Sequence, residues 1–146
     1  MKLLFEHFFT ALSIGCIGWF VSGNFYCVPS ALIAGWFIDL DHLCDFLIHS
    51  IRSKNINLSL IGTGEYFKIN NTVIVPLHAW EISALLLILG ALIPSYRALL
   101  LTAAIAHGAH LLQDQYSYRV RILGYSLISR AKCKFAYQGF CRSENG

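Results

Sequence analysis

Two short stretches of the chain contain unusually many potential metal ligands. The first, IAHGAHLLQDQ at residues 105–115, is largely apolar but contains His107, His110 and Asp114. Spacings of three and four residues place these side chains on one face of a helix. The second stretch, DLDHLCD at residues 39–45, holds three carboxylates and one imidazole, with no Lys or Arg among them. Because unpaired carboxylates repel one another, a bound divalent cation would relieve the repulsion.

The candidate ligands come from all along the chain, and each one alone has an ordinary structural explanation. Asp39 can cap a helix, Glu81 can pair with a lysine, and His107 can hydrogen-bond a backbone carbonyl. Only their convergence in space would favour a metal centre. The predicted ligands are His7, Asp39, Asp41, His42, His78, His107, His110 and Asp114.

Mixed imidazole and carboxylate ligands predict a divalent metal, zinc first, with manganese or iron as alternatives. More than four candidate ligands favours two or more ions. Such ions can clamp a phosphoester and lower the pKa of a bound water to about 7. Asp45 or Glu81 is predicted to take the proton of that water. The chain contains no GxSxG motif and no P-loop, so covalent and nucleotide-driven chemistry have no support.

The composition predicts that lipid is part of the environment of this chain. Hydrophobic residues make up 56% of it and charged residues only 13%, whereas soluble domains contain about 25% charged residues. The predicted fold class is an all-α integral membrane bundle of about four apolar helices, with a polar loop and a basic, amphipathic C-terminal tail. The chain is read as one domain, residues 1–146, with a core at 5–115 and a tail at 116–146. A soluble helical bundle is the alternative.

Four apolar segments, residues 8–22, 26–38, 73–93 and 98–112, are the predicted helices. Short connections between the first two and the last two imply antiparallel neighbours. Three of the segments are shorter than the ~20 residues of an ordinary span, so crossing a bilayer needs flanking residues or local thinning. Residues 49–72 are predicted to be a loop with at most one short helix. The tail is predicted to contain one amphipathic element near residues 120–131.

If the four segments cross the membrane in alternating directions, all candidate ligands fall at the same end of the bundle. Ten of the eleven Lys and Arg residues lie at that end, and only Arg97 lies at the other. The positive-inside rule then predicts a multi-pass protein of the inner (cytoplasmic) membrane, with its site and both termini facing the cytoplasm. The apolar N-terminus is expected to be a retained anchor. The tail is expected to lie on anionic headgroups, with nucleic acid the less favoured partner, and no oligomeric state is predicted.

These motifs resemble those of the membrane-bound metal-dependent hydrolases, one branch of which is described as LexA-binding, inner-membrane-associated hydrolases. That family has a histidine before its first apolar helix, a D-x-D-H element after the second, and a histidine and aspartate four residues apart on a later helix. The likeness covers roughly residues 5–115. The matching residues here are His7, then Asp39, Asp41 and His42, and finally His110 and Asp114.

The resemblance implies a membrane-embedded hydrolase that uses a metal. The family element H-R-G-x-T-H-S is replaced here by PLHAWE, residues 76–81, which contains His78 and no neighbouring arginine. The chain is therefore expected to be a divergent member with a different ligand set or substrate. At longer range the motifs resemble all-helical zinc phospholipases, which makes a phosphoester in lipid the expected substrate.

The favoured function is a membrane-bound metal-dependent hydrolase that acts on a phosphoester or lipid-linked substrate at the cytoplasmic face. The alternative is a non-enzymatic membrane protein with a fully ligated structural metal or an adaptor role. A small transporter or channel subunit is less favoured, because the far side of the predicted bundle lacks polar residues.

Overall fold

The computed structural model describes residues 2–118, 120–121 and 123–140, and most of these are helical. In that part of the chain, extended backbone pairs in an isolated bridge between Thr72 and Ala136. The predicted all-α class is confirmed. Cys141 and Arg142 of the predicted tail lie outside the described residues, as does Arg119.

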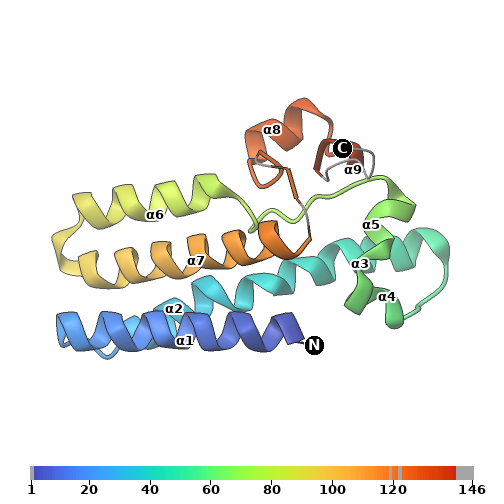
Figure 1. The fold of residues 1–146 in the computed structure, drawn as a ribbon. Helices are drawn as coiled ribbons and strands as arrows, with labels where there is room; N and C mark the ends of the chain where they lie inside the picture. The colour runs from blue at the N-terminus through green and yellow to red at the C-terminus, as the bar shows by residue number, and fades with distance from the viewer. Residues whose placement is uncertain (1, 119, 122, 141–146) are drawn as a thin grey trace.

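Four helices form the bundle: α1 (Lys2–Ser22), α2 (Cys27–Gly35), α6 (Trp80–Leu92) and α7 (Arg97–Ser117). The chain reverses between α1 and α2 and again between α6 and α7, and both reversals lie at the same end (Figure 1). Gly23 takes a φ of +70° at the first reversal, which suits glycine. The second reversal contains the short helix η2 (Pro94–Tyr96).

Glycines let α1, α2 and α7 approach closely. A Cβ on Gly15 of α1 would lie 2.8 Å from the Cα of Val28 in α2. One on Gly35 would lie 3.1 Å from the side chains of both Ala11 and Ala106. Small residues at such crossings allow backbones to meet, and this contact brings the carbonyl of Gly35 within reach of α7.

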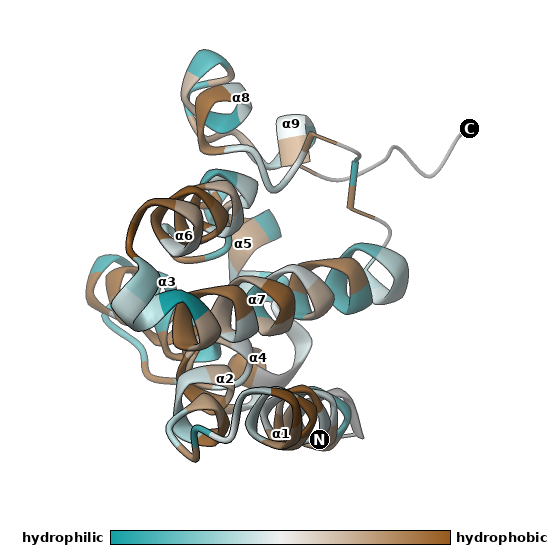
Figure 2. Cartoon of the chain, turned by 90° about the vertical axis from the view of Figure 1, so that its left-hand side faces the viewer, coloured by the Kyte–Doolittle hydropathy of each residue, from teal (hydrophilic) through white to brown (hydrophobic). Residues whose placement is uncertain are grey.

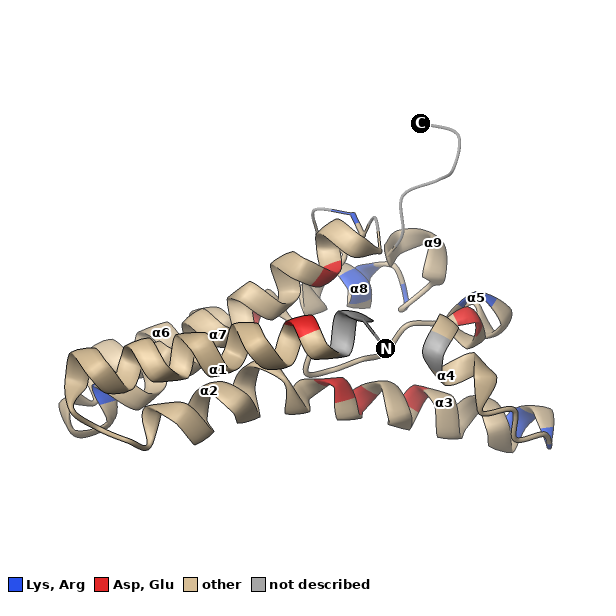
Figure 3. Cartoon of the chain, turned by 60° about the horizontal axis from the view of Figure 1, so that its bottom comes forward, with Lys and Arg blue, Asp and Glu red and all other residues tan. Residues whose placement is uncertain are grey.

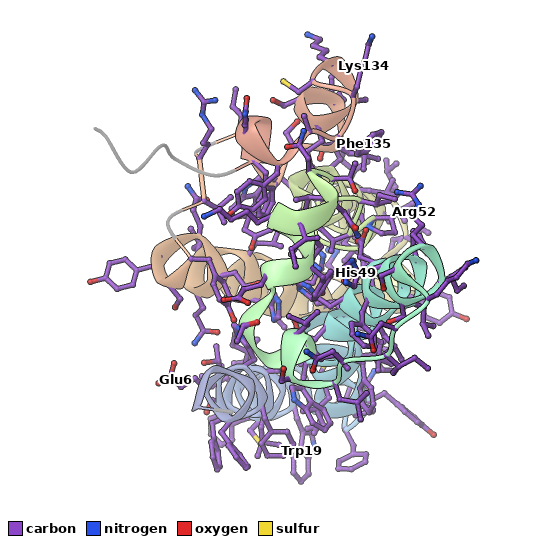
Figure 4. All side chains as sticks on the ribbon, turned by 90° about the vertical axis from the view of Figure 1, so that its right-hand side faces the viewer. Glu6, Trp19, His49, Arg52, Lys134 and Phe135 are labelled. Atoms are coloured by element: carbon purple, nitrogen blue, oxygen red, sulfur yellow. The ribbon has the colours of Figure 1, made fainter. Side chains whose placement is uncertain are left out.

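The prediction of a loop over residues 49–72 is wrong. After η1 (Phe37–Asp39), helix α3 runs from Leu40 to Ser53, and α4 (Ser59–Thr63) and α5 (Glu65–Asn70) follow. The pattern of α3 is largely inverted, because every buried side chain except that of Phe46 is polar, while Leu40, Leu43, Leu47 and Ile51 are exposed. Its buried residues are Asp41, Asp45, Phe46, His49 and Ser50. Figure 4 shows His49 within the molecule, where its Nδ1 lies 2.9 Å from Asn70 Oδ1, and Arg52 pointing outward.

The third apolar segment is helical only from Trp80, not from residue 73 as predicted. The preceding stretch, called here the 73–79 segment, is non-helical and carries buried side chains at Val73, Val75, His78 and Ala79. Pro76 explains this difference, since proline lacks a backbone N–H and disfavours helix at the residue before it.

The described part of the predicted tail packs onto the folded core. Helices α8 (Leu127–Lys132) and α9 (Tyr137–Phe140) cover the 73–79 segment (Figure 1), and Val73 N–H donates to the carbonyl of Phe135 at 2.9 Å. One buried cluster joins α3, α5, the 73–79 segment, α7 and the C-terminal part. Its members are Phe46, Tyr66, Phe67, Val73, Val75, Leu111, Val120, Tyr125 and Phe140.

Among the described residues, one helix is long and apolar enough to cross a bilayer alone, over Phe5–Ser22 of α1. Helix α6 and residues 94–117 pass the same test only as a pair, bent by 117°. Four spans are therefore not established. Only 17% of the Phe5–Ser22 window is buried, and apolar residues run along α1, α6 and α7 in Figure 2.

Charge divides the two ends of the bundle. Among the described residues, Arg97 lies at the end where the helices reverse, and other Lys and Arg residues lie at the end formed by α3, α5 and α8 (Figure 3). The acidic residues of α1, η1, α3 and α7 lie between these ends (Figure 3).

Candidate metal centre

Four side chains from three parts of the chain meet at a buried point. Asp39 ends η1, His78 lies in the 73–79 segment, and His110 and Asp114 lie one turn apart on α7. The Nε2 atoms of His78 and His110 are 3.0 Å apart. Asp114 Oδ2 lies 3.4 Å and 3.3 Å from them, and Asp39 Oδ1 lies 3.5 Å and 3.4 Å from them.

These spacings fit the ligand shell of one small ion. Nitrogen and oxygen ligands placed tetrahedrally around zinc at ~2.0–2.1 Å are ~3.3–3.4 Å from one another. Of the six distances among the four atoms, the five that involve an imidazole nitrogen span 3.0–3.5 Å. The donor atoms of Asp39, His78, His110 and Asp114 are therefore arranged to surround a cation.

Two more imidazoles border this set. His7 Nε2 of α1 lies 2.9 Å from Asp114 Oδ1, and His42 Nε2 of α3 lies 3.8 Å from Asp39 Oδ1. The six possible ligands fall into two groups, whose ligand atoms lie within 4.8 Å of one another and which share Asp114. The groups are Asp39, His42, His78 and Asp114, and His7, His110 and Asp114. Six ligands exceed the four of one tetrahedral ion.

Hydrogen bonds hold the imidazoles by the nitrogen that faces away from the centre. His110 Nδ1 donates to the carbonyl of Gly35 at 3.0 Å, and His78 Nδ1 donates to Asp41 at 3.0 Å. His7 Nδ1 donates to Gln113 Oε1 at 3.0 Å. In a neutral ring whose Nδ1 carries the proton, Nε2 keeps its lone pair. Metal-binding histidines have this arrangement, with the second nitrogen bonded to a carboxylate or carbonyl.

The electrostatics of the centre favour positive charge within it. Burial alone would raise the pKa of Asp39, but hydrogen bonds from His110 and His78 outweigh it and hold that pKa well below its usual range. Burial would lower the pKa of His78, but Asp114, Asp39 and Asp41 raise it well above the usual value. Burial, followed by the neighbouring His78, lowers the pKa of His42 to about 4, which keeps its ring neutral and able to bind a metal.

Two carboxylates of α3 fix the 73–79 segment rather than joining the centre. Val75 N–H donates to Asp45 Oδ2 at 2.9 Å, and Leu77 N–H donates to Asp41 Oδ2 at 2.9 Å. Burial raises the pKa of Asp45, although the backbone N–H groups oppose this effect. A buried non-helical segment needs side-chain partners for its backbone groups, and the inverted pattern of α3 supplies them.

Arg130 of α8 donates hydrogen bonds to backbone carbonyls of the 73–79 segment. Its guanidinium donates to the carbonyls of Ile74 at 2.6 Å, Val75 at 3.0 Å and His78 at 2.7 Å. Arg130 itself is buried. The C-terminal part of the chain therefore helps to set the position of the His78 ring.

The other predicted ligand on α7, His107, also acts on this segment. Its Nε2 donates to the carbonyl of Leu77 at 2.9 Å, and its Nδ1 lies 2.7 Å from Ser83 Oγ. Both ring nitrogens are thereby occupied, so His107 fastens α7 to α6 and to the 73–79 segment.

Replacing Asp41 with asparagine is expected to lower metal affinity about 10–100-fold, the usual effect of losing the carboxylate behind a metal-binding histidine. An amide would still accept from Leu77 but would not fix the proton on Nδ1 of His78. Competition with a chromogenic chelator measures the affinity. Cys44→Ser, an exposed change on the same helix, should leave it unchanged; an unaltered affinity in Asp41→Asn would contradict this role.

Glu81, a predicted proton acceptor, is bound elsewhere. Its carboxylate accepts from Ser126 Oγ at 2.7 Å and from the backbone N–H groups of Leu127 and Ile128 at 3.0 and 3.2 Å. These donors lie at the N-terminal end of α8. Glu81 therefore caps α8 and joins α6 to the C-terminal part.

Glu81→Gln is expected to cost about 1 kcal/mol in the free energy of unfolding, as the loss of a helix cap does. Metal content should not change, because no cluster atom bonds to Glu81. Thermal unfolding and elemental analysis of the same sample test both statements. Loss of the metal from a folded Glu81→Gln protein would be incompatible with a capping role.

Several residues that support the centre could not be identified from the sequence. Arg130 reads as one more cation of a basic tail, and Tyr125, whose hydroxyl donates to Asp114 Oδ2 at 3.3 Å, reads as an ordinary aromatic. No local spacing distinguishes either one. The sequence likewise does not indicate that the carbonyl of Gly35 binds His110 or that the amide of Gln113 binds His7.

Comparison of the chain with protein-family models, with curated proteins and with solved structures finds no match.

Proposed function

We propose that this protein is a membrane-embedded, metal-dependent hydrolase of phosphoesters. The observation that carries the proposal is the pair of Nε2 atoms of His78 and His110, 3.0 Å apart, each opposite a nitrogen that is already bonded outward. Two ring nitrogens this close must share either a proton or a cation, and the carboxylates of Asp39 and Asp114 beside them favour a divalent cation. Zinc fits these nitrogen and oxygen ligands best, and manganese and iron also accept them.

The second ligand group supports catalysis rather than a purely structural ion. His7, His110 and Asp114 provide three ligands, which is the number found in catalytic zinc sites that keep a fourth position for water. A divalent ion there would lower the pKa of water to about 7 and polarise a phosphoester.

The chain's own residues would handle the proton. The predicted acceptors Asp45 and Glu81 are held by backbone N–H groups, whereas the side chain of Asp39 is partly exposed at the centre. Among the ligand carboxylates, Asp39 is the one that solvent reaches, so it would have to leave the ion in order to accept the proton of the attacking water. The oxygen of that water bonds to phosphorus while the P–O ester bond breaks, and the proton then passes to the departing alcohol.

Exposed apolar surface supports the location in a membrane. Large side chains of α1, α6 and α7 are uncovered, among them Phe20, Leu92 and Ile105, and exposed apolar areas this extensive mark membrane or protein contacts. The cations gathered at the end beyond the cluster support the cytoplasmic orientation. The proposed assignment is a divergent member of the membrane-bound metal-dependent hydrolases, in the inner membrane.

Elemental analysis of the detergent-solubilised protein, paired with a panel of phosphomonoesters and phosphodiesters, tests the function. Bound divalent metal and turnover that disappears on chelation are expected. Metal-free protein from a gentle purification, or turnover indifferent to chelation, would refute the proposal.

Removing the metal should also destabilise the protein. A ligand held by the folded state alone adds about 2.7 kcal/mol at one hundred times its Kd. Chelation should therefore lower the Tm, and added zinc should restore it. His110→Ala should show no zinc-dependent shift, and a shift of equal size in that variant would place the ion elsewhere.

A structural metal site is the second candidate, and one observation favours it. The atoms of Asp39, His78, His110 and Asp114 suffice to enclose one ion completely, which is the arrangement of structural zinc. One fully ligated ion per chain without turnover would select this alternative, whereas two ions, or one with an open position, would select the hydrolase.

A further inference from the structure

The outer face of α3 carries a stripe of exposed apolar side chains. Its members, called here the α3 stripe, are Phe37 of η1 and Leu40, Leu43, Cys44, Leu47 and Ile51 of α3. The five large side chains among them are between 44% and 76% exposed. The buried face of the same helix holds the carboxylates of Asp41 and Asp45. The α3 stripe therefore takes no part in the metal centre.

The spacing within the α3 stripe is that of a seam between two helices. Phe37, Cys44 and Ile51 are seven residues apart, and two leucines fall between them. These are the a and d positions of a heptad, whose side chains pack into the holes of one facing helix. The apolar surface of α1 is different, since the consecutive residues 19–21 are all exposed and point in several directions. The α3 stripe therefore favours a single partner helix over an apolar solvent.

The direction of α3 argues against the surface of a bilayer as the partner. The helix runs roughly along the bundle and extends beyond the start of α1, at the end where Lys and Arg residues gather (Figures 1 and 3). An amphipathic helix that binds a bilayer surface lies in its plane. If the bundle helices cross the membrane, as proposed above, α3 points away from that plane toward water. A contiguous apolar patch in water is typical of a protein contact.

A second copy of this chain fits the α3 stripe. Two copies in one membrane have the same orientation, so a two-fold axis between them lies along the membrane normal. Because α3 runs along the bundle, this axis sets two α3 helices parallel and in register, with each residue of the stripe beside its counterpart. Leucine at the d positions is typical of parallel two-stranded seams. Covering both stripes would remove about 1,100 Å² of surface, close to the ~1,200 Å² of a small specific interface.

We propose that the protein forms a parallel dimer, in which the α3 stripe of one copy packs on the α3 stripe of a second copy. Each copy keeps its own metal centre, because Asp41 and Asp45 face the interior of their own chain. The proposal goes beyond the hydrolase function and does not depend on turnover. The parallel direction of the seam rests on the proposed membrane location.

Oxidative crosslinking of Cys44 tests the seam. Three variants each keep one exposed cysteine, which is Cys44, Cys16 of α1 or Cys133 of α8, and have serine at the other cysteine positions. In phosphatidylcholine vesicles treated with copper phenanthroline, the Cys44 protein should form at least about tenfold more disulfide-linked dimer than either control, because a dimer raises the effective concentration of the paired thiols. Equal yields from the three proteins would overturn the inference.

Two further cysteine positions separate parallel from antiparallel packing. Leu40→Cys and Leu47→Cys are each made as the only cysteine of the chain. In the parallel seam each variant forms a disulfide with its own counterpart. In an antiparallel seam a disulfide forms only when the two variants are mixed, and this result would contradict the parallel dimer.

The mass of the detergent-solubilised protein is an independent measurement. Analytical ultracentrifugation should find twice the 16.4 kDa of one chain. L40E/L47E places like charges opposite each other and should give monomers, whereas I56E/L58E, at exposed residues just beyond α3, should stay dimeric. A dimer that survives L40E/L47E, or a monomeric wild type that also fails to crosslink, would refute the seam.

Two other outcomes identify which proposal has failed. If a nitroxide on Cys44 collides with oxygen more often than with a water-soluble nickel complex, the α3 stripe faces lipid and the dimer is refuted. Metal-free protein that still crosslinks through Cys44 would refute the hydrolase and leave the dimer standing.

Discussion

Asp114→Asn is expected to lower metal affinity more than ~100-fold, beyond the effect of changing a residue behind a ligand, and to abolish hydrolysis. Asp114 belongs to both ligand groups. One oxygen lies 2.9 Å from Nε2 of His7, and the other lies near Nε2 of His78 and of His110. An amide of the same shape removes the negative charge. It also turns an NH₂ group either toward His7 or toward His78 and His110.

Metal content and turnover of the purified variant are the measurements. Tyr116→Phe, a change at a 92% exposed residue two positions further along α7, is the matched control and should behave like the wild type. A folded Asp114→Asn protein with full metal content would show that the two ligand groups are not joined through this carboxylate.

Arg130→Met is expected to lower the free energy of unfolding by about 3–5 kcal/mol, since it leaves two buried carbonyls and one partly buried carbonyl without their charged donor. For a chain of this size the Tm should fall by about 10 °C or more. Because one of those carbonyls belongs to His78, metal affinity should also fall. Arg130→Lys should restore only part of the stability, because an ammonium group lacks the forked geometry of guanidinium.

Thermal unfolding in detergent measures the effect on stability, and chelator competition measures the effect on the metal. Lys132→Met removes an exposed cation from the same helix and should change neither. If Arg130→Met and Lys132→Met unfolded at the same temperature, the C-terminal part would not support the centre as described.

The ligand positions that follow from helical periodicity could be predicted from the sequence. His110 and Asp114 are four residues apart, so any helix over that stretch brings them to one face, and alternating apolar segments carry His7 and Asp39 to the same end. The structure gathers six of the eight predicted ligands: His7, Asp39, His42, His78, His110 and Asp114.

The rest depended on the 73–79 segment. Its apolar residues extend the helical pattern of α6, but Pro76 and burial make it non-helical. Its backbone then needs the carboxylates of Asp41 and Asp45 and the guanidinium of Arg130. Those needs arise only in three dimensions, which is why the carboxylates of α3 read as metal ligands or proton acceptors and the supporting residue of α8 reads as part of a basic tail.

The most direct test of the central claim is the anomalous X-ray signal of the purified, metal-loaded protein, measured at the absorption edge of the bound element. The account predicts an ion about 2.0–2.2 Å from Asp114 and from Nε2 of at least one of His78 and His110. An ion bound only to other residues, or none within bonding distance of Asp114 in a fully folded sample, would contradict it.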